Sequence, residues 1–123
     1  MELKSRSEAQ VRILELSGRF DSYTAPQVRQ WMEEAADREP AQLVLNLSGV
    51  HFVDSTALAT LVQGMKRCRQ LKGDLRLCCL QQPVRMIFEL TRLDKAFEIF
   101  ASEEAAVQTF DAQKEMGLLQ PDF

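Results

Sequence analysis

The chain has 123 residues, of which 46% are hydrophobic, and a formal net charge of −3. These values fit one globular domain whose core needs no disulfide or metal. The mildly acidic charge argues against a direct nucleic-acid surface, which would need a basic patch, and no apolar run approaches the ~20 residues of a membrane span.

The cysteines and the N-terminus predict a cytoplasmic protein. The three cysteines are odd in number and two of them are adjacent, so we expect buried thiols in a reducing compartment. Together with the lone His51 they offer too few ligands for a metal site. Residues 1–6 are polar and lack the apolar core of a signal peptide.

The first 40 residues predict an antiparallel hairpin followed by a helix. Residues 3–8 form a weak edge-strand pattern, and Val11–Leu16 forms a clearer strand that Gly18 ends. Thr24 begins a helix-start pattern in which its side chain is expected to cap the helix, with Pro26 in the first turn. Apolar residues at helical spacing then continue toward a stop at Pro40.

The middle of the chain predicts a buried strand and a long amphipathic helix. Leu43–Leu47 is the near-continuous apolar run of a strand that is covered on both faces. We expect a turn at Ser48-Gly49 before a short segment, residues 50–53. The helix that begins near Ser55 carries its apolar residues on one face, and Gly73 is expected to close it.

The remaining residues predict two strands and two helices. A strand around Leu75–Cys79 precedes a short helix that opens at Gln82-Pro83, and Ala96–Phe100 reads as a last strand. Ser102 then caps a final helix. The order β-β-α-β-α-β-α-β-α indicates an α/β domain with a mixed sheet.

The segment Asp54-Ser55-Thr56 is the part of the chain that carries chemistry. No phosphate-binding loop, nucleophile elbow or metalloprotease motif occurs, and catalysis by His51 has no supporting signature. Capping by Asp54 or Ser55 would by itself explain an acid and two hydroxyls at a helix start. The same position would also accept a phosphate without unfolding the helix, because the exposed N–H groups and the dipole favour negative charge.

The chain resembles the STAS domains, the family of bacterial anti-sigma factor antagonists. The resemblance rests on residues 43–58, on Gly18-Arg19-Phe20-Asp21 with Thr24-Ala25, and on three C-terminal segments; these are Leu90-Thr91-Arg92-Leu93, Phe97-Glu98-Ile99-Phe100 and Ser102-Glu103-Glu104-Ala105. It covers about residues 8–110. It implies one STAS-type α/β domain over residues 1–115, with a mixed sheet of four to five strands, about four helices and a flexible tail over residues 116–123.

The resemblance also implies a function in partner switching during transcription regulation. Members of the family bind an anti-sigma factor that is also a serine kinase, and a PP2C-type phosphatase reverses the phosphorylation. Carried over to this chain, the phosphorylated residue is Ser55, and the partner-binding residues are Asp21, Asp54, Ser55 and Thr56. We therefore expect a monomeric binding protein rather than an enzyme, with no catalytic residue, metal or cofactor.

Two substitutions depart from the family pattern, since Ala57 stands where Gly is usual and Phe20 where Leu is usual. The Ala57 methyl group is expected to lie beside the phosphorylated serine. One alternative is a STAS binding module that is not phosphorylated and serves a lipid-transport or other signalling complex. A receiver domain is rejected, because residues 16–18 offer no acidic pair for Mg²⁺ and residues 100–102 offer no Lys.

Overall fold

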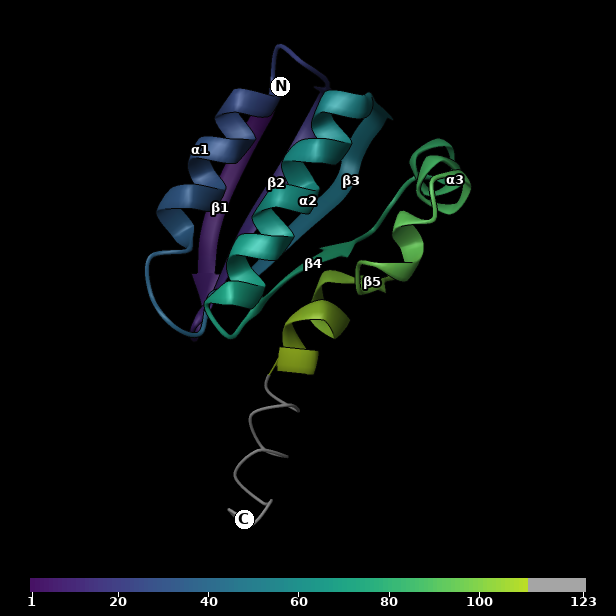
Figure 1. The fold of residues 1–123 in the computed structure, drawn as a ribbon. Helices are drawn as coiled ribbons and strands as arrows, with labels where there is room; N and C mark the ends of the chain where they lie inside the picture. The colour runs from purple at the N-terminus through teal and green to yellow at the C-terminus, as the bar shows by residue number, and fades with distance from the viewer. Residues whose placement is uncertain (111–123) are drawn as a thin grey trace.

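A five-stranded mixed sheet forms the centre of the protein in a computed structural model that describes residues 1–110 (Figure 1). The strands lie in chain order across the sheet: β1 (Glu2–Glu8), β2 (Val11–Phe20), β3 (Gln42–Val53), β4 (Asp74–Cys78) and β5 (Ile99–Phe100). β1 pairs antiparallel with β2, and each later neighbour pairs in parallel. The predicted mixed α/β sheet and the hairpin are confirmed, whereas the expected boundary at residue 115 and the tail 116–123 lie outside the described residues.

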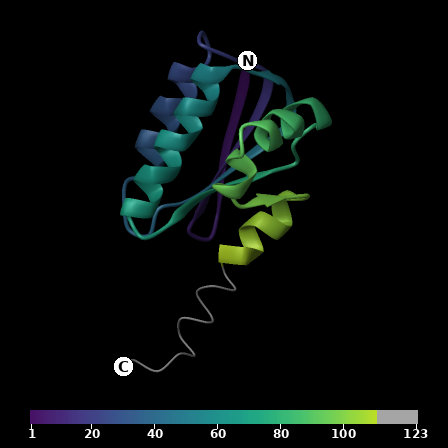
Figure 2. The same cartoon turned by 45° about the vertical axis from the view of Figure 1, so that its right-hand side comes forward.

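Helices cover both faces of this sheet. α1 (Ala25–Ala35) and α2 (Ser55–Gln70) lie side by side on one face, and α3 (Gln82–Leu90) follows β4 (Figure 1). The helical residues 103–110 lie on the opposite side of the sheet (Figure 2). About four helices are therefore present, as predicted, with one short 3₁₀ turn, η1 (Leu93–Lys95), between α3 and β5. Within residues 1–110, no helix has the length and apolar character needed to cross a membrane.

The run Leu43–Leu47 is buried on both faces, as its composition predicts. Leu43, Leu45 and Leu47 pack into the main core under α1 and α2. Val44 points the other way and joins a second cluster with Ala106, Val107 and Phe110 of the helical segment. β3 is thus covered on both faces along the run Leu43–Leu47. At its C-terminal end, where the candidate site begins, Val50 and Val53 are buried in the main core, while His51 on the other face is exposed.

The break predicted at Gly18 and the turn predicted at Ser48-Gly49 are both wrong. β2 continues to Phe20 and β3 continues unbroken to Val53. The pairing of the two strands shifts register near Ser17 and Gly18, as at a β-bulge. Gly18 has a φ of +106°, a conformation that glycine adopts readily. Both glycines therefore mark bulges inside one long strand pair, which carries the two strands to a common end.

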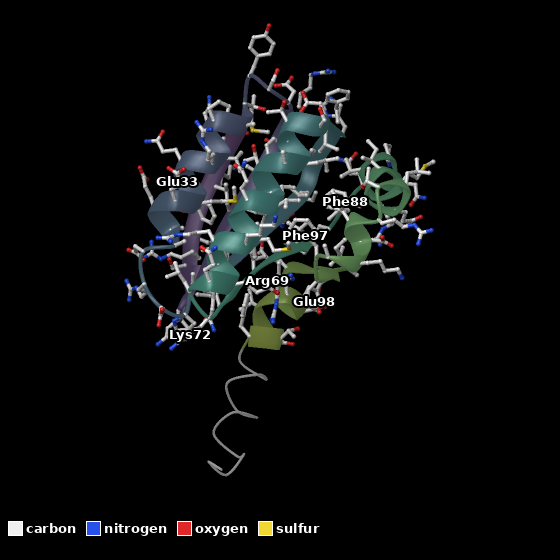
Figure 3. All side chains as sticks on the ribbon, in the orientation of Figure 1. Glu33, Arg69, Lys72, Phe88, Phe97 and Glu98 are labelled. Atoms are coloured by element: carbon white, nitrogen blue, oxygen red, sulfur yellow. The ribbon has the colours of Figure 1, made fainter. Side chains whose placement is uncertain are left out.

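The last strand is shorter than predicted, because only Ile99–Phe100 forms the ladder with β4, and Glu98 contributes just its carbonyl oxygen, which accepts from Leu77 N at 3.1 Å. Ala96 N donates to Leu93 O at 3.0 Å instead, which closes the 3₁₀ turn, and Phe97 N donates to the same oxygen at 3.1 Å. This places the Phe97 ring edge-on to Phe88 of α3, with centroids 5.8 Å apart (Figure 3). The turn therefore supplies core packing where a longer strand was expected.

Candidate functional site

The candidate site lies where β2 and β3 end. Because these strands are parallel neighbours with Phe20 opposite Val53, the residues that follow each of them meet at one edge of the sheet. One is the loop 21–24 that leads into α1, and the other is Asp54 with the first turn of α2; both lie at the top of Figure 1. A hydrogen bond from Asp54 N to Phe20 O, 3.3 Å long, joins them at the base.

Asp54 connects the two segments through its carboxylate. Its Oδ1 accepts from Ala57 N at 2.9 Å, which is the cap of α2. Its Oδ2 accepts from Ser22 N at 3.0 Å in the neighbouring loop. The predicted capping of the helix at Asp54-Ser55 is confirmed for Asp54, and the same side chain fixes the loop against the helix.

Asp21 organises the loop from within. Its Oδ1 accepts from Tyr23 N at 3.0 Å and Thr24 N at 3.2 Å. Partial burial would raise the pKa of Asp21, but these backbone bonds, with help from the Thr24 hydroxyl and Arg19, outweigh it and hold the pKa below its ordinary value. Asp21 is therefore ionised at neutral pH, and it acts first as the acceptor that shapes this turn.

Thr24 does not cap α1 with its side chain, so that prediction is wrong. Its backbone is already helical, at φ −102° and ψ −19°, whereas a capping residue is usually extended. The Thr24 hydroxyl turns back into the loop, where it donates to Arg19 O and accepts from Asp21 N, each at 2.9 Å. The hydroxyl thus strengthens the same loop that Asp21 holds.

Ser55 and Thr56 are the exposed first residues of α2. Within residues 1–110, neither hydroxyl forms a hydrogen bond, because Asp54 supplies the cap. The N–H groups of this first turn have no carbonyl one turn earlier to accept from them. Ser55 therefore offers a free hydroxyl to solvent, at a helix terminus that tolerates added negative charge.

Arg19 is a cation in contact with this acidic edge. Its guanidinium lies 3.8 Å from the centroid of the Phe52 ring, and its Nε is 3.5 Å from Asp21 Oδ2. Stacking on the ring limits the freedom of the guanidinium beside the carboxylate. Arg19 thereby offsets part of the charge of Asp21, while Asp54 has no side-chain cation among the described residues.

The structure brings all four predicted site residues to one edge, since Asp21 and Asp54 flank the loop and Ser55 and Thr56 begin α2. The methyl group of Ala57, expected beside the phosphorylated serine, is instead fully buried in the core, because α2 turns that position inward. The sequence interpretation missed Arg19 and Tyr23. The signal for Tyr23 was its place between Asp21 and Thr24, inside a segment that had already been singled out.

The polar side chains at this edge are the carboxylates of Asp21 and Asp54, the hydroxyls of Ser55 and Thr56, and the guanidinium of Arg19. Within the described part of the chain, no three His, Cys, Asp or Glu side chains gather where a metal ion could be held. His51 is exposed, and its imidazole makes no hydrogen bond within residues 1–110. Burial raises the pKa of Cys68 to about 12, so this thiol is not a nucleophile at neutral pH.

Comparison with known proteins identifies related chains of similar length. Residues 2–106 match the family described as STAS domain. An anti-sigma F factor antagonist of Paenibacillus polymyxa is 32% identical over 98 residues, which are 79% of this chain and 84% of that protein. An anti-sigma-B factor antagonist of Listeria monocytogenes is 33% identical over 99 residues, which are 80% and 86% of the two chains.

A solved structure shows the same fold. The crystal structure of an anti-sigma factor antagonist from Mycobacterium paratuberculosis matches with a TM-score of 0.78 and 27% identity, covering 88% of this chain and 92% of that one.

Proposed function

Because the chain belongs to the STAS domain family, we propose that it is an anti-sigma factor antagonist whose binding is controlled by phosphorylation of Ser55. The unmodified protein binds an anti-sigma factor that is also a serine kinase. The kinase transfers the γ-phosphate of ATP to Ser55, and the modified protein leaves. A PP2C-type phosphatase hydrolyses the phosphoserine and restores the binding form.

The observation that carries this proposal is the free hydroxyl of Ser55 next to a helix cap that does not need it. Asp54 satisfies Ala57 N, so modification of the next residue breaks no hydrogen bond of the fold. A phosphate adds about −2 charge at neutral pH, and the N-terminus of α2 stabilises negative charge. We therefore infer that the phosphorylated protein stays folded.

The same phosphate would oppose binding. It would follow Asp54 directly in the chain and adjoin the loop that carries the ionised Asp21, where Arg19 balances only part of the charge. A partner surface that packs here would have to desolvate the phosphate or place its own acids against it. A loss of ~3 kcal/mol lowers affinity more than a hundredfold, which is enough to switch partners.

Phosphate transfer tests the proposal directly. The full chain is incubated with ATP and each serine-kinase anti-sigma factor encoded in its genome, and mass spectrometry locates the phosphate. We expect modification at Ser55, removal of it by a PP2C-type phosphatase, loss in Ser55→Ala and retention in Ser7→Ala, which alters an exposed serine of β1. A kinase-like partner that binds without modifying Ser55 would favour a non-phosphorylated module of a lipid-transport or other signalling complex.

A charge mimic separates binding from folding. Ser55→Asp is expected to weaken the partner complex more than a hundredfold in calorimetry, while its melting temperature stays within about 2 °C of the wild type. A large fall in melting temperature would contradict the role assigned to the helix terminus. Unchanged affinity would contradict the switch.

A further inference from the structure

Tyr23 presents the most exposed large apolar side chain in residues 1–110. The side chain is 88% exposed, compared with 79% for Leu90 and 50% for Met86 on α3. An aromatic ring left in water buries a large apolar area when a partner covers it, and Tyr is among the residues that most often dominate binding energy. Tyr23 belongs to the loop that adjoins the start of α2.

The backbone on either side of this ring is fixed. Tyr23 N and Thr24 N donate to Asp21 Oδ1, and Ser22 N donates to Asp54 Oδ2. The ring therefore projects from an ordered turn, and binding has to order little more than its two side-chain torsions. An exposed aromatic side chain on an ordered loop can therefore bind a partner with little loss of conformational entropy.

The neighbouring carboxylates of Asp21 and Asp54 already accept hydrogen bonds within the protein. Both carboxylate oxygens of Asp54 accept backbone N–H groups, and Asp21 Oδ1 accepts two of them. Asp21 Oδ2 faces Arg19 at 3.5 Å. These carboxylates position the loop, so the contact area offered to a partner comes mainly from the side chain that they leave free.

We propose that Tyr23 is the anchor of the partner interface, and that its ring enters an apolar pocket on the anti-sigma factor kinase. This inference rests on the proposed function of Ser55. The two residues are coupled through one hydrogen bond: Ser22 N meets Asp54 Oδ2 at 3.0 Å, and Tyr23 and Ser55 each follow directly in the chain. The position of the Ser55 hydroxyl relative to the Tyr23 backbone is therefore fixed. A kinase that binds the ring would have this hydroxyl at a constant place relative to its own active site.

Affinity measurements on the full chain test the anchor. The probe is the serine-kinase anti-sigma factor found to modify Ser55, titrated by calorimetry. Tyr23→Ala is expected to weaken binding at least about thirtyfold, as for an interface hot spot, and Tyr23→Phe to stay within about threefold because the ring remains. Leu90→Ala removes a similarly exposed apolar side chain of α3 and is expected to bind as the wild type does.

The outcomes separate this inference from the proposed function. Wild-type affinity in Tyr23→Ala would overturn the anchor while leaving phosphorylation of Ser55 in place. An equal loss in Tyr23→Phe or in Leu90→Ala would also overturn it, because the ring would then not be the specific contact. If no kinase bound the wild type, the proposed function and the anchor would both fail.

Kinetics distinguish an anchor from a residue that acts only on the fold. With the protein as the substrate of the kinase, Tyr23→Ala is expected to raise KM about thirtyfold and leave kcat unchanged, because the ring binds but does not touch the reacting atoms. Melting temperature should change by no more than about 2 °C, since the side chain is 88% exposed. A fall in kcat with KM unchanged would overturn the proposal.

Chemical modification gives a readout without any substitution, since Tyr23 is the one tyrosine in the sequence. Nitration by tetranitromethane, followed by mass spectrometry of the tyrosine peptide, is expected to modify the free protein readily and to be slowed at least tenfold in the kinase complex. The non-binding variant Ser55→Asp mixed with the kinase should show no protection. Full reactivity of Tyr23 in the wild-type complex would overturn the proposal.

Discussion

Replacing Asp54 tests the carboxylate that joins the loop to α2. Asp54→Ala removes two hydrogen bonds, to Ala57 N at 2.9 Å and to Ser22 N at 3.0 Å. Loss of a helix cap costs about 1 kcal/mol, and loss of a partly exposed hydrogen bond to a charged group costs about as much again. We therefore expect the free energy of unfolding to fall by about 2 kcal/mol and the melting temperature by about 8 °C.

Urea unfolding monitored by circular dichroism measures this loss, and two variants divide it. Asp54→Asn keeps one carbonyl oxygen for Ala57 N and replaces the acceptor that meets Ser22 N, so about half of the loss is expected. Ser55→Ala is the matched control at the next residue. Its hydroxyl makes no hydrogen bond within residues 1–110, so a change below about 0.5 kcal/mol is expected.

Two results would refute this reasoning. A loss below about 0.5 kcal/mol in Asp54→Ala would mean that the carboxylate does not hold the two segments together. Equal losses in Asp54→Asn and Asp54→Ala would mean that the hydrogen bond to Ala57 N adds no stability of its own. Either result would leave the loop without the support that the proposed partner face requires.

Three further substitutions probe the loop and the frame around it. Asp21→Ala is expected to speed hydrogen exchange at Tyr23 N and Thr24 N at least tenfold and to weaken partner binding, so unchanged exchange would contradict its role in the turn. Glu103→Gln is expected to destabilise the protein at pH 7 and to do so progressively less as the pH falls into the acid range. The hydrogen bond with Arg6, with help from Asn46, holds the pKa of Glu103 below its ordinary value, so its stabilising contribution is present at neutral pH and is lost as the pH falls through the lowered pKa. A stability difference between variant and wild type that does not depend on pH in urea unfolding would refute this. Gly49→Ala would place a methyl carbon 2.6 Å from Ser17 Cβ, so urea unfolding should show a loss of about 2 kcal/mol, and a loss near zero would show that the strands separate easily there.

The features that were predicted correctly depend on local patterns. The apolar run Leu43–Leu47 predicted a strand covered on both faces, and the acid before Ser55 marked a helix start. Both patterns are complete within a few residues. They sufficed to predict the sheet, the helices and the position of Ser55 on an exposed helix terminus.

The features that were missed depend on contacts distant in sequence. Gly18 and Gly49 look like strand breakers, but each meets a neighbouring strand that accommodates a bulge, and this is visible only once the strands are paired. Thr is a residue type that often caps helices, but the Thr24 hydroxyl accepts from Asp21 N and donates to Arg19 O instead. The bond from Ser22 to Asp54 joins residues 32 apart, so no local pattern could reveal that Tyr23 is held beside the start of α2.

The two hydrogen bonds of Asp54 have a consequence for the insulation of signalling circuits. Asp54 holds the loop through Ser22 N and Asp21 holds it through Tyr23 N, and every residue except proline supplies such an N–H group. The side chains at positions 22 and 23 therefore carry no part of these hydrogen bonds. Partner preference can therefore change at these positions without a cost in folding. A cell that keeps several such antagonists can hold their circuits apart by varying two side chains on one common frame.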